Sequence, residues 1–109
     1  YGFLHIGNFR GAIVFNLLRN WLEKIGYRVK YVYNYTDVDD KIIDRANSES
    51  RPPSEIAETY IREFETDFQR LRLKKHDLNP RVSQTMPEII AMIQSLIQAG
   101  KAYELNGDV

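Results

Sequence analysis

Residues 9–36 read FRGAIVFNLLRNWLEKIGYRVKYVYNYT, and the periodicity of this stretch changes once, at Gly26. Over residues 9–25 apolar side chains recur every third or fourth position, which predicts an amphipathic helix with a wide buried stripe. Residues 29–35 alternate between β-branched or aromatic and mostly polar side chains, which predicts a strand. Gly26 stands where a helix C-terminal glycine belongs. We therefore expect an α/β fold with parallel strands, completed by a further strand ahead of Tyr1.

Three more helices are expected downstream of this unit. Carboxylates at Asp37, Asp39 and Asp40 favour the start of a second helix, and a merely solvated helix start explains them equally well. A third helix is expected to be capped by Ser54, and its apolar stripe comprises Ile56, Tyr60, Phe64, Phe68 and Leu71. Pro87 and Gly100 frame a fourth helix.

The segments between and after these helices are polar or turn-like. Residues 74–81 are expected to form a polar connector, in which His76 would be a solvated surface residue. The tyrosines of residues 29–35 are expected to be core or sheet-face residues, as are Phe15 and Trp21. Asn106-Gly107 predicts a hairpin turn. Because the chain begins at Tyr1 and its return arm stops at Val109, we expect a fragment truncated at both ends.

Composition narrows the classes of function. The chain has 109 residues, 15 Lys plus Arg against 15 Asp plus Glu, no Cys and two His. Because positive and negative charges balance, the composition does not indicate a nucleic-acid partner. A small basic cluster, Arg70, Arg72, Lys74 and Lys75, is better explained as a solvated helix end than as an RNA contact. Thiolate zinc sites and disulfides are excluded from this stretch. With no membrane-length apolar run or signal segment, we expect a soluble, cytoplasmic protein.

The loop that precedes the first helix is the candidate for anion binding. It contains Leu4-His5-Ile6-Gly7-Asn8. A helix N-terminus offers backbone amides and a positive dipole end to a phosphate, and Gly7 allows close approach of a ligand. His5 and Asn8 would add side-chain donors. Taken alone, the tetrapeptide fits a plain turn as well.

Residues 5–8 resemble the HIGH motif of class I aminoacyl-tRNA synthetases, with Asn8 in a position where some members of the class also carry Asn. Residues 34–46, NYTDVDDKIIDRA, are similar to the N-x-T-D-[IV]-D-D-K-I-I-x-R-A run of the cysteine-tRNA ligase family. A weaker likeness to the connecting segment of that family runs from Pro80 to Val109. The resemblance spans nearly the whole chain.

The resemblance implies a Rossmann-like, HUP-type catalytic domain that ligates L-cysteine to tRNA(Cys) with ATP as a substrate. Cysteinyl-adenylate would form first, and its acyl group would then pass to tRNA. It implies ATP binding by residues 5–8, with His5 and Asn8 acting in catalysis and Ile6 and Gly7 lining the site. Thr36 would contact the amino acid or the adenylate, with Asn34 as a neighbour.

The resemblance also implies a division of the chain near residue 47. Residues 1–47 would belong to the nucleotide-binding half and residues 48–109 to a helical connecting segment that ends in a cut hairpin. Zinc is expected in full-length members of the family, but its ligands, like the lysine-rich signature loop, would lie outside this chain. Two alternatives stay open: a mycothiol-pathway cysteine ligase, and a non-catalytic nucleotide-binding paralogue.

Overall fold

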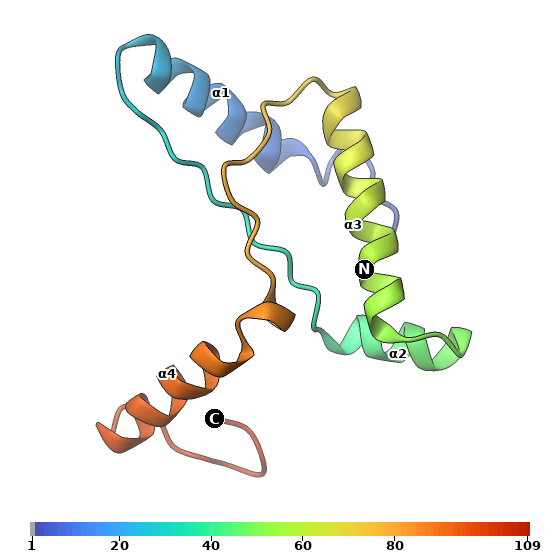
Figure 1. Ribbon diagram of the computed structural model, residues 1–109, viewed down its shortest axis with the longest axis vertical. Helices are drawn as coiled ribbons and strands as arrows, with labels where there is room; N and C mark the ends of the chain where they lie inside the picture. The colour runs from blue at the N-terminus through green and yellow to red at the C-terminus, as the bar shows by residue number, and fades with distance from the viewer. Residues whose placement is uncertain (1) are drawn as a thin grey trace.

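Two extended segments cross the middle of the molecule and join helices that lie around its edge (Figure 1). The computed structural model describes residues 2–109. Its helical elements are α1 (Arg10–Lys24), α2 (Asp40–Glu49), α3 (Pro53–Arg70), the short 3-10 helix η1 (Val82–Gln84) and α4 (Met86–Gln98). The radius of gyration is 17.4 Å, whereas a compact domain of this size has about 13 Å. The arrangement is therefore open, and α4 stands away from the other helices.

Glycines end α1 and α4 as predicted. Gly26 has a φ of 96°, its N–H donates to the carbonyl of Glu23, and the next N–H, of Tyr27, donates to the carbonyl of Leu22. This pair of bonds is a Schellman motif, which satisfies carbonyls at the helix end. Gly100, with a φ of 65°, ends α4 in the same way. The Asn106-Gly107 turn is confirmed by paired backbone bonds between Leu105 and Asp108.

The extended segments of residues 31–35 and 77–82 lie side by side and run parallel. Isolated parallel bridges join Val32 to Leu78 and Tyr35 to Arg81. The N–H of Tyr35 donates to the carbonyl of Pro80 over 2.8 Å. Among residues 2–109 no continuous strand forms, so the predicted parallel strands are not confirmed as such. The predicted connector at residues 74–81 joins α3 to η1 without a helix, and its second half also pairs with the first segment. The strand expected ahead of Tyr1 lies outside the described residues.

The N-termini of α2 and α3 differ in how they are capped. The Asp39 carboxylate accepts a hydrogen bond from the N–H of Lys41 over 3.0 Å and caps α2. The prediction that Ser54 caps α3 was wrong, because the helix begins at Pro53 and Pro52 is at its N-cap position. Proline suits the first helical position, since its fixed φ matches the helix and its missing N–H would have no partner there.

Two small apolar clusters hold the helices together. One lies between α2 and α3 and comprises Ile42, Ala46, Ile56 and Ala57, with Tyr60 against it. The other joins the start of α1 to the end of α3 and comprises Phe9, Ala12 and Phe68, with Phe64, Leu71 and Leu73 against it. The predicted stripe of α3 is thus confirmed as its packing face.

The buried stripe predicted along residues 9–25 is confirmed at Phe9 and is wrong for most of its length. Leu17 is 69% exposed and Trp21 58%, and Phe15, which was also expected in the core, is 55% exposed. The contacts of α1 use the face that carries Phe9, Ala12 and Arg19, and most of the predicted stripe lies on another part of the helix surface. No residue of α4 is buried either. Apolar faces of this extent mark surfaces that contact something else. Among residues 2–109 we find no helix that is both long and apolar enough to cross a bilayer.

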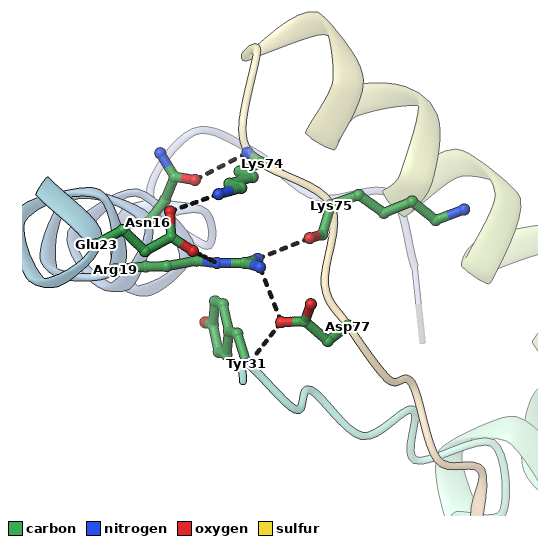
Figure 2. A network of polar contacts seen from close by, with 7 residues as sticks. All are labelled: Asn16, Arg19, Glu23, Tyr31, Lys74, Lys75 and Asp77. Atoms are coloured by element: carbon green, nitrogen blue, oxygen red, sulfur yellow. Dashed lines mark hydrogen bonds and ion pairs between the residues drawn. The ribbon is translucent and has the colours of Figure 1, made fainter. Parts of the chain in front are cut away.

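A buried arginine ties α1 to the second extended segment, and Asp77 extends this link to the first (Figure 2). Arg19 is 5% exposed, and its guanidinium donates to Glu23, to the carbonyl of Lys75 and to Asp77. The distances are 3.1, 2.7 and 2.8 Å, respectively. Asp77 also accepts the N–H of Tyr31 over 2.7 Å. Arg19 and Asp77 together therefore link α1 to the beginnings of both segments.

His76 lies inside an aromatic cluster, so its prediction as a solvated residue was wrong. It is 7% exposed. Its ring stacks on Tyr33 at 4.7 Å and meets Tyr31 edge-on at 4.8 Å and Phe68 at 4.6 Å. Asn79 donates its side-chain N–H to His76 Nδ1 over 3.1 Å, so the neutral ring carries its proton on Nε2. Burial lowers the pKa of His76, the charge of Arg19 lowers it further, and Asp77 and Glu65 oppose this.

This buried histidine predicts a specific loss of stability in mild acid. Because the pKa of His76 is lower in the folded than in the unfolded state, its contribution is present above the ordinary value of 6.5 and is lost as pH falls below it. We expect the free energy of unfolding to fall between pH 7.5 and 5.5 in the natural protein and to fall less in His76→Phe. Urea unfolding of both at the two pH values is the measurement. Equal falls would contradict the assignment, and His5→Phe, at an exposed histidine, is the control.

Candidate nucleotide and amino-acid site

A cavity of about 200 Å³ opens at the C-terminal end of residues 31–35, where α2, α3 and the N-terminal segment meet. Its polar lining comes from Asn34, Thr36 and Asp37, at the end of the extended segment. Its apolar and aromatic lining comes from the N-terminal segment, the extended segment, α2 and α3, and includes Leu4, Tyr33, Tyr35, Ile42, Ala57, Tyr60, Ile61 and Phe64. An apolar hollow with a few convergent polar groups is the usual form of a small-ligand site.

Asn34 and Thr36, the predicted pair for amino-acid binding, lie together on this cavity. The amide of Asn34 donates to the hydroxyl oxygen of Thr36 over 3.3 Å. A hydroxyl has one donor and two acceptor sites, so Thr36 keeps its proton and one lone pair for a ligand. Both side chains are exposed, as a binding role requires. Whether they bind an amino acid stays a prediction.

The turn of residues 5–8 has a fixed internal geometry. The N–H of Gly7 donates to His5 Nδ1 over 3.1 Å, and the N–H of His5 donates to Asn8 Oδ1 over 3.0 Å. Because Nδ1 accepts, the neutral imidazole carries its proton on Nε2, which makes His5 a hydrogen-bond donor there. The Asn8 oxygen is used in the same turn, which leaves its amide N–H groups as donors toward a ligand.

The geometry of the turn explains why residue 7 is a glycine. A β-carbon at residue 7 would lie 2.9 Å from Cε1 and 3.0 Å from Nδ1 of the His5 ring. Real β-carbons do not approach so closely, so a side chain here would displace the imidazole. The glycine therefore permits the close approach of the His5 ring, in the space where the sequence predicted the approach of a ligand.

Backbone amides contribute less to this turn than the sequence suggested. The N–H groups of Asn8, Phe9 and Arg10 donate to the carbonyls of His5, Ile6 and Gly7, at 2.9, 3.1 and 3.4 Å. They are engaged within the turn, and the donors that remain for an anion are mainly side chains.

The two predicted groups of site residues are neighbours but do not line one cavity. Leu4, next to His5 in the chain, lines the cavity with Thr36, whereas residues 5–8 do not. Among residues 2–109 no three His, Cys, Asp or Glu side chains come together as metal ligands would. Zinc therefore has no fitting site in the described part of the chain, and we assign it no step.

Asp37 is the site residue whose role the sequence left open. Its carboxylate accepts the N–H of Ser83 over 3.0 Å at Oδ1 and the Ser83 hydroxyl at Oδ2. Partial burial raises the pKa of Asp37, but the hydrogen bonds from Ser83 outweigh it, and the pKa lies below its ordinary value. The carboxylate is thus ionised at neutral pH. Ser83 lies 46 residues away in η1, a partner that no local motif indicates.

Known proteins are similar to this chain over its whole length. Residues 1–109 match the model of the family described as tRNA synthetases class I (C) catalytic domain. The chain is 55% identical to a cysteine–tRNA ligase of Bdellovibrio bacteriovorus, and 47% identical to one of Archaeoglobus fulgidus. It is 49% identical to one of Brevibacillus brevis. Each match covers all of this chain and 23% of the relative, so the chain spans about a quarter of their length.

Proposed function

The chain belongs to the family of class I (C) tRNA synthetase catalytic domains, and on that premise we propose that it is part of a cysteine–tRNA ligase. The observation that carries the proposal is the match over all 109 residues, with the relatives above named as ligases of this kind. The family supports a Rossmann-like fold for the complete domain. We propose residues 1–47 as its nucleotide-binding half and residues 48–109 as its connecting segment.

The proposed reaction has two steps. A carboxylate oxygen of L-cysteine attacks the α-phosphorus of ATP, the bond to the β-phosphate oxygen breaks, and pyrophosphate leaves. The acyl group of cysteinyl-adenylate then passes to a hydroxyl of the terminal ribose of tRNA(Cys), and AMP leaves. Positioning and stabilisation of developing charge supply most of the catalysis in such substitutions.

We propose distinct roles for the two groups of site residues. His5, through Nε2–H, and Asn8, through its amide, donate to ATP, with Ile6 and Gly7 shaping the turn. The fixed tautomer of His5 supports this role, because it leaves a donor on the ligand side. Thr36 contacts the cysteine ammonium or the adenylate through its hydroxyl, and Asn34 orients that hydroxyl. In this proposal ATP and cysteine bind at adjacent groups of residues. No feature of the described residues favours an amino sugar over tRNA as acceptor.

The function is tested by cysteine-dependent exchange of pyrophosphate into ATP in a full-length protein that carries this chain. We expect Thr36→Val to raise the KM for cysteine about tenfold or more and the KM for ATP much less, because a hydrogen bond to a charged group is worth roughly 1.5–3 kcal/mol. Thr36→Ser, which keeps the hydroxyl, is the matched control. A larger rise in the KM for ATP would assign Thr36 to the nucleotide. No exchange with cysteine in the natural protein would refute the proposed function.

A further inference from the structure

The contact between Asp37 and Ser83 fastens the end of one extended segment to the short helix η1. Asp37 uses both carboxylate oxygens, one for the Ser83 N–H at 3.0 Å and one for its hydroxyl. Two hydrogen bonds to the two oxygens of one ionised group restrict its orientation as well as its distance. Asp37 also lines the cavity, next to Thr36. The contact therefore lies at the candidate amino-acid site itself.

Thr36 is held in place through its two neighbours. On one side, Tyr35 is buried, its N–H donates to the Pro80 carbonyl, and its phenol donates to Glu65 over 3.2 Å. On the other side, Asp37 is bound to Ser83. Thr36 itself is exposed, and its hydroxyl accepts a hydrogen bond from the side chain of Asn34. The position of the Thr36 hydroxyl thus depends on both flanking anchors.

We propose that Asp37 and Ser83 are positioning residues that hold the Thr36 hydroxyl at the cavity for the cysteine substrate. This inference rests on the proposed function. The Tyr35 anchor alone leaves the chain able to rotate about the backbone of Thr36, and the second anchor removes that freedom. Displacement of a binding group by about 1 Å can cost two orders of magnitude in rate, so loss of this anchor affects the substrate that Thr36 contacts.

The molecule contains a matched structural control for this contact. Asp77 joins the same two segments at their other end, where it accepts the N–H of Tyr31 and a bond from Arg19 (Figure 2). The Tyr31–Asp77 and Asp37–Ser83 contacts both span 46 residues. Asp77 is not among the residues that line the cavity. Loss of either carboxylate weakens the pairing of the segments, but only loss of Asp37 releases Thr36.

The test compares four variants of the full-length protein by cysteine-dependent pyrophosphate exchange, with cysteine and ATP varied separately. We expect Asp37→Ala to lower kcat/KM for cysteine about tenfold, with the KM for ATP within about twofold of the natural value. Ser83→Ala, which keeps the backbone N–H, should lower it about threefold, and Ser83→Thr, which restores a hydroxyl, should recover most of that loss. Asp77→Ala should lower the thermal midpoint and leave both KM values within about twofold.

Several outcomes would overturn the inference. Equal effects of Asp37→Ala and Asp77→Ala on cysteine and ATP would make the contact purely structural. If Asp37→Ala does not fold, the two Ser83 variants test the proposal instead. Equal cysteine KM values in Ser83→Ala, Ser83→Thr and the natural protein would refute the positioning role. Absence of exchange in the natural protein would instead refute the proposed function, which separates the two failures.

Discussion

Substitution of His5 by alanine is expected to slow cysteinyl-adenylate formation by roughly 30- to 1,000-fold, or about 2 to 4 kcal/mol of transition-state stabilisation. Negative charge develops on the phosphate oxygens in the proposed step, and a preorganised donor at such a place is worth this much. The preorganisation is visible in the turn, where the Gly7 N–H holds Nδ1 and so keeps the proton on Nε2. Cysteine-dependent pyrophosphate exchange measures the effect, and an unchanged rate in a folded variant would refute the role.

Two glycine variants sharpen the test of His5. In Gly7→Ala the new β-carbon would meet the imidazole at 2.9 Å, so the ring must move, and we expect part of the loss seen in His5→Ala. In Gly11→Ala the new β-carbon meets nothing within 4 Å, and alanine within a helix is favoured over glycine by about 1 kcal/mol. Gly11→Ala should therefore keep full activity. Similar losses in both variants would show that the turn tolerates no change at all, independently of His5.

The parts of the fold that local chemistry determines were predictable from the sequence. Gly26, Gly100 and the Asn106-Gly107 pair adopt positive φ values, which few other residues accept, so each marked a helix end or a turn. The stripe of α3 was predictable because it repeats over 18 residues of one helix. Ser54 was misjudged because two local signals competed, and the proline before it fixed the helix start.

The parts that depend on distant contacts were not predictable. Lys74, Lys75 and Asp77 surround His76 in sequence and indicate a surface segment, yet the parallel pairing with residues 31–35 turns the imidazole into the aromatic cluster. The apolar stripe of residues 9–25 has the periodicity of a buried face, but periodicity does not show which elements cover that face. Both errors concern tertiary neighbours and not the local conformation.

Some features of the candidate site were likewise predictable from the sequence, and others depend on distant contacts. Thr36 was predicted from the family resemblance and from its place after the predicted strand, because open α/β sheets bind ligands at the carboxyl ends of their strands. Asn34 was predicted as its neighbour, and the binding role of both stays a prediction. The role of Gly7 and the tautomer of His5 required coordinates, because both depend on where one ring lies. Ser83 required them even more, since its partner Asp37 is 46 residues away.

Replacement of Arg19 by methionine is expected to reduce the free energy of unfolding by roughly 2 to 3 kcal/mol, the largest stability effect we foresee for one side chain. Arg19 is 5% exposed, and without it the Lys75 carbonyl loses a bond while two carboxylates lose their buried cation. Those carboxylates reach water in part, which places the loss below that of a fully enclosed pair. Arg70→Met is the control, because its side chain is 75% exposed and such pairs contribute about 0–1 kcal/mol. Chemical unfolding of both variants is the measurement, and equal losses would mean that the guanidinium does not join α1 to the extended segments.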